Sequence, residues 1–160
     1  MMNSKTRRLV MLVAIALTVG LFSLEVSTSA QSPNNCLKVK GKSLDVTIGG
    51  STTGTITNGG ILNGTTERVF NGAPLPTADP TTISFTGDLT VTTDRGVLKT
   101  HDVYIYDFAR GLATTIQRID PNASTGVFAG ATGVLYGNAK ATNPFTVEGD
   151  ITGEICFANE

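Results

Sequence analysis

Apolar and polar residues alternate along most of the chain after residue 36, and a period of two residues is typical of β-strands. The clearest alternation spans Thr82–Thr93, and it places Ile83, Phe85, Leu89 and Val91 on one face. A hairpin turn is predicted at residues 94–96, and a partner strand with polar and apolar groups on both faces is predicted at 97–108. Further strands are expected at 37–48 (one strand, or a pair broken at residue 41), 53–57, 65–70, 112–119 and 145–157.

A glycine-rich stretch, Ser124–Gly137, interrupts residues of high β propensity at short intervals. Glycine within a strand pattern marks a bulge or a sharp bend. We therefore predict a strand, a corner at Gly130–Gly133 and a second strand. Three prolines in Asn71–Pro80 predict a loop at the rim of the sheet.

The strand count defines the fold class. Eight to nine strands are expected, and no strong helical period follows the N-terminal segment. We predict an all-β protein with a single closed antiparallel β-barrel of about eight strands, formed by residues 31–160. A two-sheet β-sandwich is the alternative architecture.

The N-terminal segment has the features of a secretory signal peptide. Lys5, Arg7 and Arg8 precede an apolar run at Leu9–Phe22, and small residues at 28–30 offer a cleavage site after Ala30. We expect residues 1–30 to form a signal helix that is cleaved, which would make the protein secreted or periplasmic. An uncleaved N-terminal anchor is the alternative.

The charge of the remaining chain limits its partners. Removing three basic residues and one acidic residue with the signal peptide leaves 12 − 3 = 9 basic and 13 − 1 = 12 acidic residues, a formal net charge of −3. These charges are scattered, so we expect no nucleic-acid partner. No stable membrane insertion is expected after cleavage.

Cys36 and Cys156 are the only cysteines, and they lie near the two ends of the mature chain. In an oxidising compartment such a pair is expected to form a disulfide, here between the first and last strands. His101 is the only histidine and no Cys-x-x-Cys motif occurs, so no metal site is expected. No cofactor is expected either.

Few residues suggest chemistry. Tyr104 and Tyr106 share a strand face with Asp102 and are candidates to line a cavity. Asp107 and Arg110 flank a turn and are candidates to bind an anionic or polar ligand, although a solvated ion pair is the favoured explanation. Glu67, Tyr104 and Tyr106 are the candidate catalytic residues. A catalytic His101 would need a serine from elsewhere, because no Gly-x-Ser-x-Gly motif occurs.

One short motif carries a family resemblance. Gly126-Val127-Phe128 followed by Ala131-Thr132-Gly133 resembles the G-x-F-x-x-A-x-G signature of dirigent proteins, which belong with the allene oxide cyclase-like barrels. The likeness covers Thr82–Phe157, and the mature chain is similar to secreted bacterial proteins with the same Phe-Ala-Gly-Ala-Thr-Gly core. It implies an eight-stranded antiparallel barrel and a homo-oligomer.

Two functions follow as hypotheses. The first is a secreted, non-catalytic barrel that binds a small apolar molecule or serves as an envelope or extracellular module. The second is a cyclase or isomerase of the kind the resemblance implies, which acts by holding a small apolar substrate in a shaped pocket. A third possibility is a barrel filled by its own side chains, which would have no cavity and would carry its function on its surface.

Overall fold

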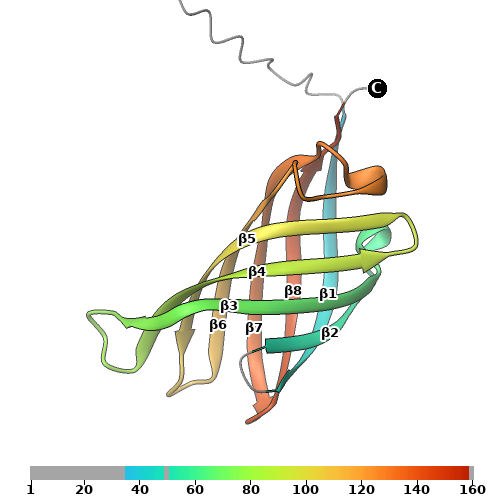
Figure 1. Ribbon diagram of the computed structural model, residues 1–160. Coiled ribbons are helices and arrows are strands. Elements are labelled where there is room, and N and C mark those ends of the chain that lie inside the picture. The colour runs from blue at the N-terminus through green and yellow to red at the C-terminus, as the bar shows by residue number, and fades with distance from the viewer. Residues whose placement is uncertain (1–34, 49–50, 159–160) are drawn as a thin grey trace, which may run out of the picture. The chain divides into compact units, whose positions relative to one another are not determined.

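The computed structural model describes residues 35–48 and 51–158, which form eight antiparallel strands in a closed barrel (Figure 1). Each strand pairs with its neighbour in the sequence, and β1 closes the barrel against β8. The strands are β1 (Cys36–Ile48), β2 (Ser51–Thr57), β3 (Gly64–Pro76), β4 (Thr82–Thr93), β5 (Gly96–Asp107), β6 (Leu112–Ile119), β7 (Thr132–Asn143) and β8 (Thr146–Cys156). The predicted barrel is confirmed, and the sandwich is excluded.

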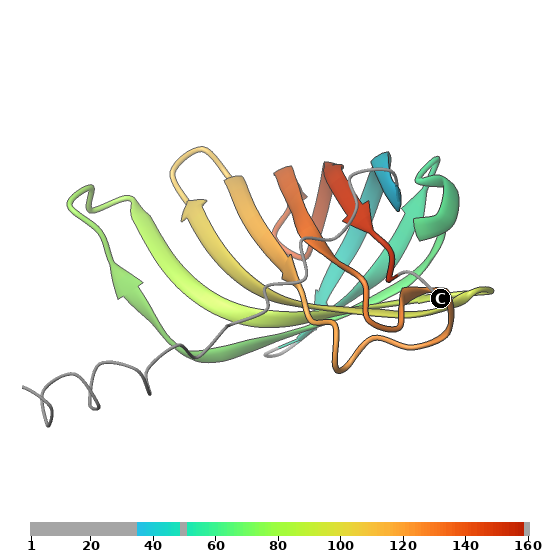
Figure 2. The same cartoon turned by 90° about the horizontal axis from the view of Figure 1, so that it is seen from above.

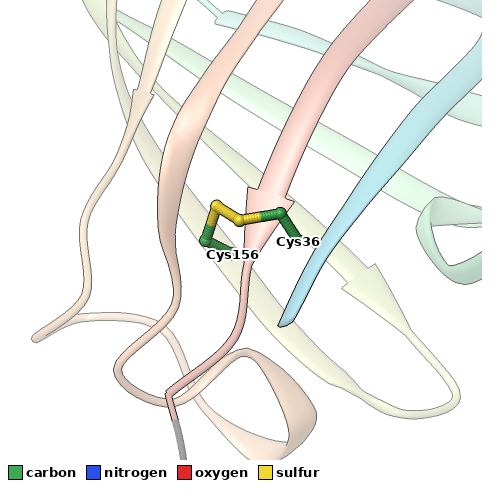
Figure 3. The surroundings of a disulfide bond; sticks show 2 residues. All are labelled: Cys36 and Cys156. Carbon is green, nitrogen blue, oxygen red and sulfur yellow. A yellow bond between two sulfur atoms is a disulfide. The ribbon is translucent and has the colours of Figure 1, made fainter. Parts of the chain in front are cut away.

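The predicted disulfide is confirmed. Cys36 and Cys156 are bonded to each other and are also register partners at the start of β1 and the end of β8 (Figure 3). The two Cα atoms lie 3.9 Å apart. The bond therefore joins the strands whose pairing closes the barrel.

The barrel has two unlike ends. Figure 1 shows the β4–β5 hairpin and the β6–β7 connection at one end, and the β3–β4, β5–β6 and β7–β8 connections at the other. The first end holds the hydrophobic core, with Leu62, Leu98, Leu135 and Ile155 fully buried. We call it the closed end, and the other the open end. Figure 2 shows the same strands from above, curving around the interior.

A short 3-10 turn, η3 (Gly126–Phe128), covers the closed end. Phe128 is fully buried and belongs to the core cluster. Backbone hydrogen bonds tie this turn to the β4–β5 hairpin, from Val127 N to Arg95 O and from Thr125 N to Val97 O. A second 3-10 turn, η2 (Gly60–Leu62), buries Leu62 against the same core.

The prediction for Ser124–Gly137 was therefore wrong in its first half. Residues 124–131 form a loop with η3, and only the following segment is a strand, β7. Two of the glycines allow the chain to turn, because Gly126 and Gly130 take positive φ values of 63° and 70°. These values suit a compact turn and not a strand.

Two other segments differ from the prediction. The segment 37–48 is one strand without a break at Gly41. The predicted loop at 71–80 is partly strand, because β3 resumes pairing at Leu75 and Pro76 after a register shift. Proline is tolerated there since the shift places it at an exposed rim, beyond the regular ladder.

The predicted signal peptide, residues 1–30, lies outside the described residues. Within 35–48 and 51–158, no helix has the length and apolar character needed to cross a membrane.

Candidate functional site: a cavity in the barrel

A cavity of about 450 Å³ occupies the interior between the core and the open end. It reaches the β5–β6 and β7–β8 connections, because Phe108, Gly111, Asn143 and Pro144 line it. Cavities of this volume are typical of small-molecule sites. The interior is thus filled by side chains at one end and hollow at the other.

Small residues on one wall create the space. Ala113 of β6 and Ala139 of β7 are register partners, and both line the cavity together with Gly137 and Ala141. Larger side chains at these inward positions would fill the interior, as they do at the closed end.

An aromatic cluster from β3, β4 and β5 forms another part of the cavity lining. The rings of Phe85 and Tyr104 stack with centroids 4.9 Å apart and an interplanar angle of 9°. Phe70 meets both edge-on, at 5.0 Å from Phe85 and 5.6 Å from Tyr104. All three line the cavity. This cluster offers an apolar surface suited to a ligand with a flat or branched hydrocarbon body.

A buried ion pair lies beside the aromatic cluster. Arg68 Nη1 is 3.1 Å from Asp45 Oδ2, and Thr66 Oγ1 donates to Asp45 Oδ1 at 2.8 Å. The guanidinium carbon of Arg68 lies 5.6 Å from the centroid of the Tyr104 ring, a cation–π distance. Both oxygens of Asp45 are therefore occupied, and Arg68 is held between a carboxylate and an aromatic face.

A second carboxylate, Asp102, is buried in a cage of hydrogen bonds. Thr100 Oγ1 donates to Oδ1 and Tyr104 Oη donates to Oδ2, each at 2.5 Å. Gln117 Nε2 is 3.4 Å from Oδ2. Burial raises the pKa of Asp102, although these hydrogen bonds oppose the shift. Burial likewise raises the pKa of Tyr104, so its phenol keeps its proton.

Three buried polar atoms of cavity-lining residues have no hydrogen-bond partner among the described residues: Arg68 Nε, Thr115 Oγ1 and Gln117 Oε1. Buried polar groups are nearly always hydrogen-bonded, to protein, water or ligand. Three residues of the cavity lining therefore each carry a covered polar atom that lacks a partner.

Only two of the candidate residues predicted from the sequence line the cavity. Tyr104 and Tyr106 line the cavity. Glu67 is exposed, on the face of β3 opposite to Thr66 and Arg68, and it does not line the cavity. Asp107 and Arg110 lie at the β5–β6 turn as an ion pair with a 3.5 Å separation, and Arg110 is 77% exposed. Neither residue lines the cavity.

His101 takes part in a different, external cluster. Its Nδ1 is 2.6 Å from Asp88 Oδ1 and its Nε2 is 3.2 Å from Asp120 Oδ2. The hydrogen bond with Asp88 raises the pKa of His101, and Asp120 adds to the shift. The side chain is 68% exposed, so this cluster is a surface contact between β5, β4 and the loop after β6.

Within the described ranges, no group of three or more His, Cys, Asp or Glu side chains is arranged to hold a metal ion. Asp45 and Asp102 are each engaged by protein donors.

Sequence reasoning missed most of the polar residues of the cavity: Asp45, Thr66, Arg68, Thr115 and Gln117. The signal for Asp45 was present in the alternation of β1, where the polar and apolar positions exchange faces midway along the strand. Such an exchange indicates a polar interior in one half of a barrel.

The sequence matches no protein-family model, and it has no significant match among curated proteins.

Proposed function

We propose that this protein is a secreted binding protein whose barrel cavity holds a small, mainly apolar molecule. The observation that carries the proposal is the cavity of about 450 Å³ at the open end. A protein that needed only a stable barrel would gain from filling this space, because every lost contact in a core costs stability. The aromatic cluster and the wall of small residues favour an apolar ligand.

A paired substitution tests the proposal. Ala139→Leu places a branched side chain in the cavity, whereas Lys140→Leu adds the same side chain at the next, exposed position of β7. The neutral fluorescent probe N-phenyl-1-naphthylamine is expected to bind the wild-type protein and the Lys140→Leu variant. Its affinity for Ala139→Leu is expected to fall about tenfold or more.

Equal affinity of the probe for both variants would refute a site inside the barrel. Circular dichroism and urea unfolding of the two variants serve as the folding control.

A second function, conversion of the bound molecule, has one specific observation in its favour. Asp102 and Tyr104 form a buried hydrogen-bonded pair, and burial raises the pKa of both groups. Such a pair suits proton transfer to a reactive ligand. The resemblance to allene oxide cyclase-like barrels supports this function too. Loss of turnover with retained binding in Asp102→Asn would favour it over simple binding.

The proposed compartment is extracellular or periplasmic. The disulfide between Cys36 and Cys156 supports this, because such bonds persist in oxidising compartments. N-terminal sequencing of the protein recovered from the medium or periplasm tests it, and a chain that begins at Gln31 is expected.

We also propose that copies of the chain associate. Val103, Ile116 and Tyr136 form one row across the outer faces of β5, β6 and β7, and their side chains are 49%, 49% and 48% exposed. Apolar rows of this kind on a barrel exterior favour contact with another surface. Sedimentation of the wild-type protein and of Ile116→Lys tests the proposal, and dissociation is expected only for the variant.

A further inference from the structure

The three unpartnered atoms of the cavity wall have complementary chemistry. Arg68 Nε is only a donor, Gln117 Oε1 is only an acceptor, and the Thr115 hydroxyl is both. All three residues surround Tyr104. Thr115 is its register partner on β6, Gln117 shares Asp102 with it, and Arg68 covers its ring.

The Asp102 cage sets which atom of Gln117 is left unpaired. Nε2 points to Asp102 Oδ2, so the amide carbonyl is the atom without a partner. Asp102 accepts from Thr100, Tyr104 and Gln117 at once, and these bonds hold the Gln117 amide in this orientation. A ligand with both a donor and an acceptor would satisfy these atoms.

With Asp102 ionised, negative charge outweighs positive charge near this point. Arg68 is engaged by Asp45, and Asp102, when ionised, also raises the pKa of Arg68. A ligand carboxylate would compete with two protein carboxylates for one guanidinium, and it would be desolvated without a free cation to pair with. An anionic ligand is therefore disfavoured at this depth.

We infer that the ligand of this cavity is a neutral molecule that carries a hydroxyl group ahead of an apolar body, with the hydroxyl near Arg68, Thr115 and Gln117 and the body against the aromatic cluster. A hydroxyl accepts from Arg68 Nε and donates to Gln117 Oε1, which no hydrocarbon or carboxylate does. The unpartnered atoms are covered by their neighbours, so small side-chain rotations accompany binding. This inference rests on the proposed binding function.

Four ligands that share a naphthalene ring and differ in the group at position 1 test the inference: 1-naphthalenemethanol, 1-naphthoate, 1-naphthylmethylammonium and 1-methylnaphthalene. Each displaces N-phenyl-1-naphthylamine from the full, oxidised protein. The alcohol is expected to bind about tenfold more tightly than 1-methylnaphthalene, since one buried hydrogen bond is worth roughly that factor. The two charged ligands are expected to bind more weakly than the alcohol.

Two nearly isosteric substitutions locate the effect. Gln117→Met and Thr115→Val remove the unpartnered atoms, and each is expected to abolish most of the alcohol's advantage over 1-methylnaphthalene. Thr114→Ser, on the exposed face of the same strand, keeps the hydroxyl that donates to Asn138, and this control is expected to change nothing. If Gln117→Met does not fold, Thr115→Val alone decides.

The outcomes separate the two proposals. If 1-naphthoate or the ammonium binds as well as the alcohol, or if the alcohol gains nothing over 1-methylnaphthalene, the inference is overturned while the binding function stands. If none of the four ligands and no probe binds, the binding function fails and the inference fails with it.

Discussion

Removal of the disulfide offers a quantitative test of the closed barrel. The double substitution Cys36→Ala with Cys156→Ala releases a link between residues 120 positions apart. In the chain-entropy model, a loop of that length restricts the unfolded chain by ~5 kcal/mol. We expect the free energy of unfolding to fall by an amount approaching this value, because the link mainly limits the unfolded state.

The native barrel is expected to survive the substitution. β1 and β8 stay in register from Cys36–Cys156 to Val46–Thr146, so backbone hydrogen bonds hold the closure without the sulfur atoms. Ligand affinity should therefore be unchanged while stability falls.

Urea unfolding followed by circular dichroism measures the effect. With a slope of about 2 kcal/mol per M, a loss of ~5 kcal/mol lowers the midpoint by about 2.5 M. The reduced wild-type protein is the control and should match the double variant. A loss below about 1 kcal/mol would refute the reasoning, as would loss of ligand binding in a variant that is still folded.

Four further substitutions probe the buried Phe128 ring, a close backbone contact and a surface ion pair. Phe128→Ala should cost about 3–5 kcal/mol in urea unfolding because the ring is fully buried, and a loss under about 1 kcal/mol would contradict its place in the core. Gly126 and Gly60 have similar positive φ angles, 63° and 61°, so the backbone strain of an alanine is similar at both. Gly126→Ala should nevertheless destabilise the protein more than Gly60→Ala. A new Cβ at Gly126 would lie 2.4 Å from Arg95 O, whereas nothing lies within 4 Å at Gly60, and equal losses would contradict this packing. The raised pKa of His101 predicts stability that is full below its ordinary value of 6.5 and falls as the pH rises through the folded-state value, so His101→Gln should flatten the pH profile of stability.

Much of the fold could be predicted from alternation. The bounds of β4 and β6, Thr82–Thr93 and Leu112–Ile119, are those expected from the sequence. The expected count of eight to nine strands was compatible with one barrel, and the family resemblance implied the same fold. The strand predicted in the first half of Ser124–Gly137 was wrong, because glycine spacing alone does not distinguish a strand bend from a compact turn. The apolar character of Phe128 does not distinguish them either, since the residue would be buried in both structures.

The site was harder to predict, because alternation shows which residues share a face and not which face points inward. In β1, Leu44, Val46 and Ile48 are exposed, while Asp45 is buried at the cavity. The usual rule of apolar inside therefore gives the wrong face for this half of the strand. Pairing of Asp45 with Arg68, which are 23 residues apart, depends on the register of three strands.

The same limit applies to Tyr104 and Asp102. Their shared face was evident from their spacing, and both face the interior in the structure. The sequence alone could not show that the space beside them is hollow, because that depends on the small residues Ala113, Gly137 and Ala139 of two other strands.

Native mass spectrometry of the protein purified from its own secretion route tests the central claim most directly. We predict an oxidised chain that carries a small, neutral, non-covalently bound molecule, or that takes up 1-naphthalenemethanol when it is added. A bare chain that binds neither this alcohol nor N-phenyl-1-naphthylamine would contradict the claim that the barrel is a binding site.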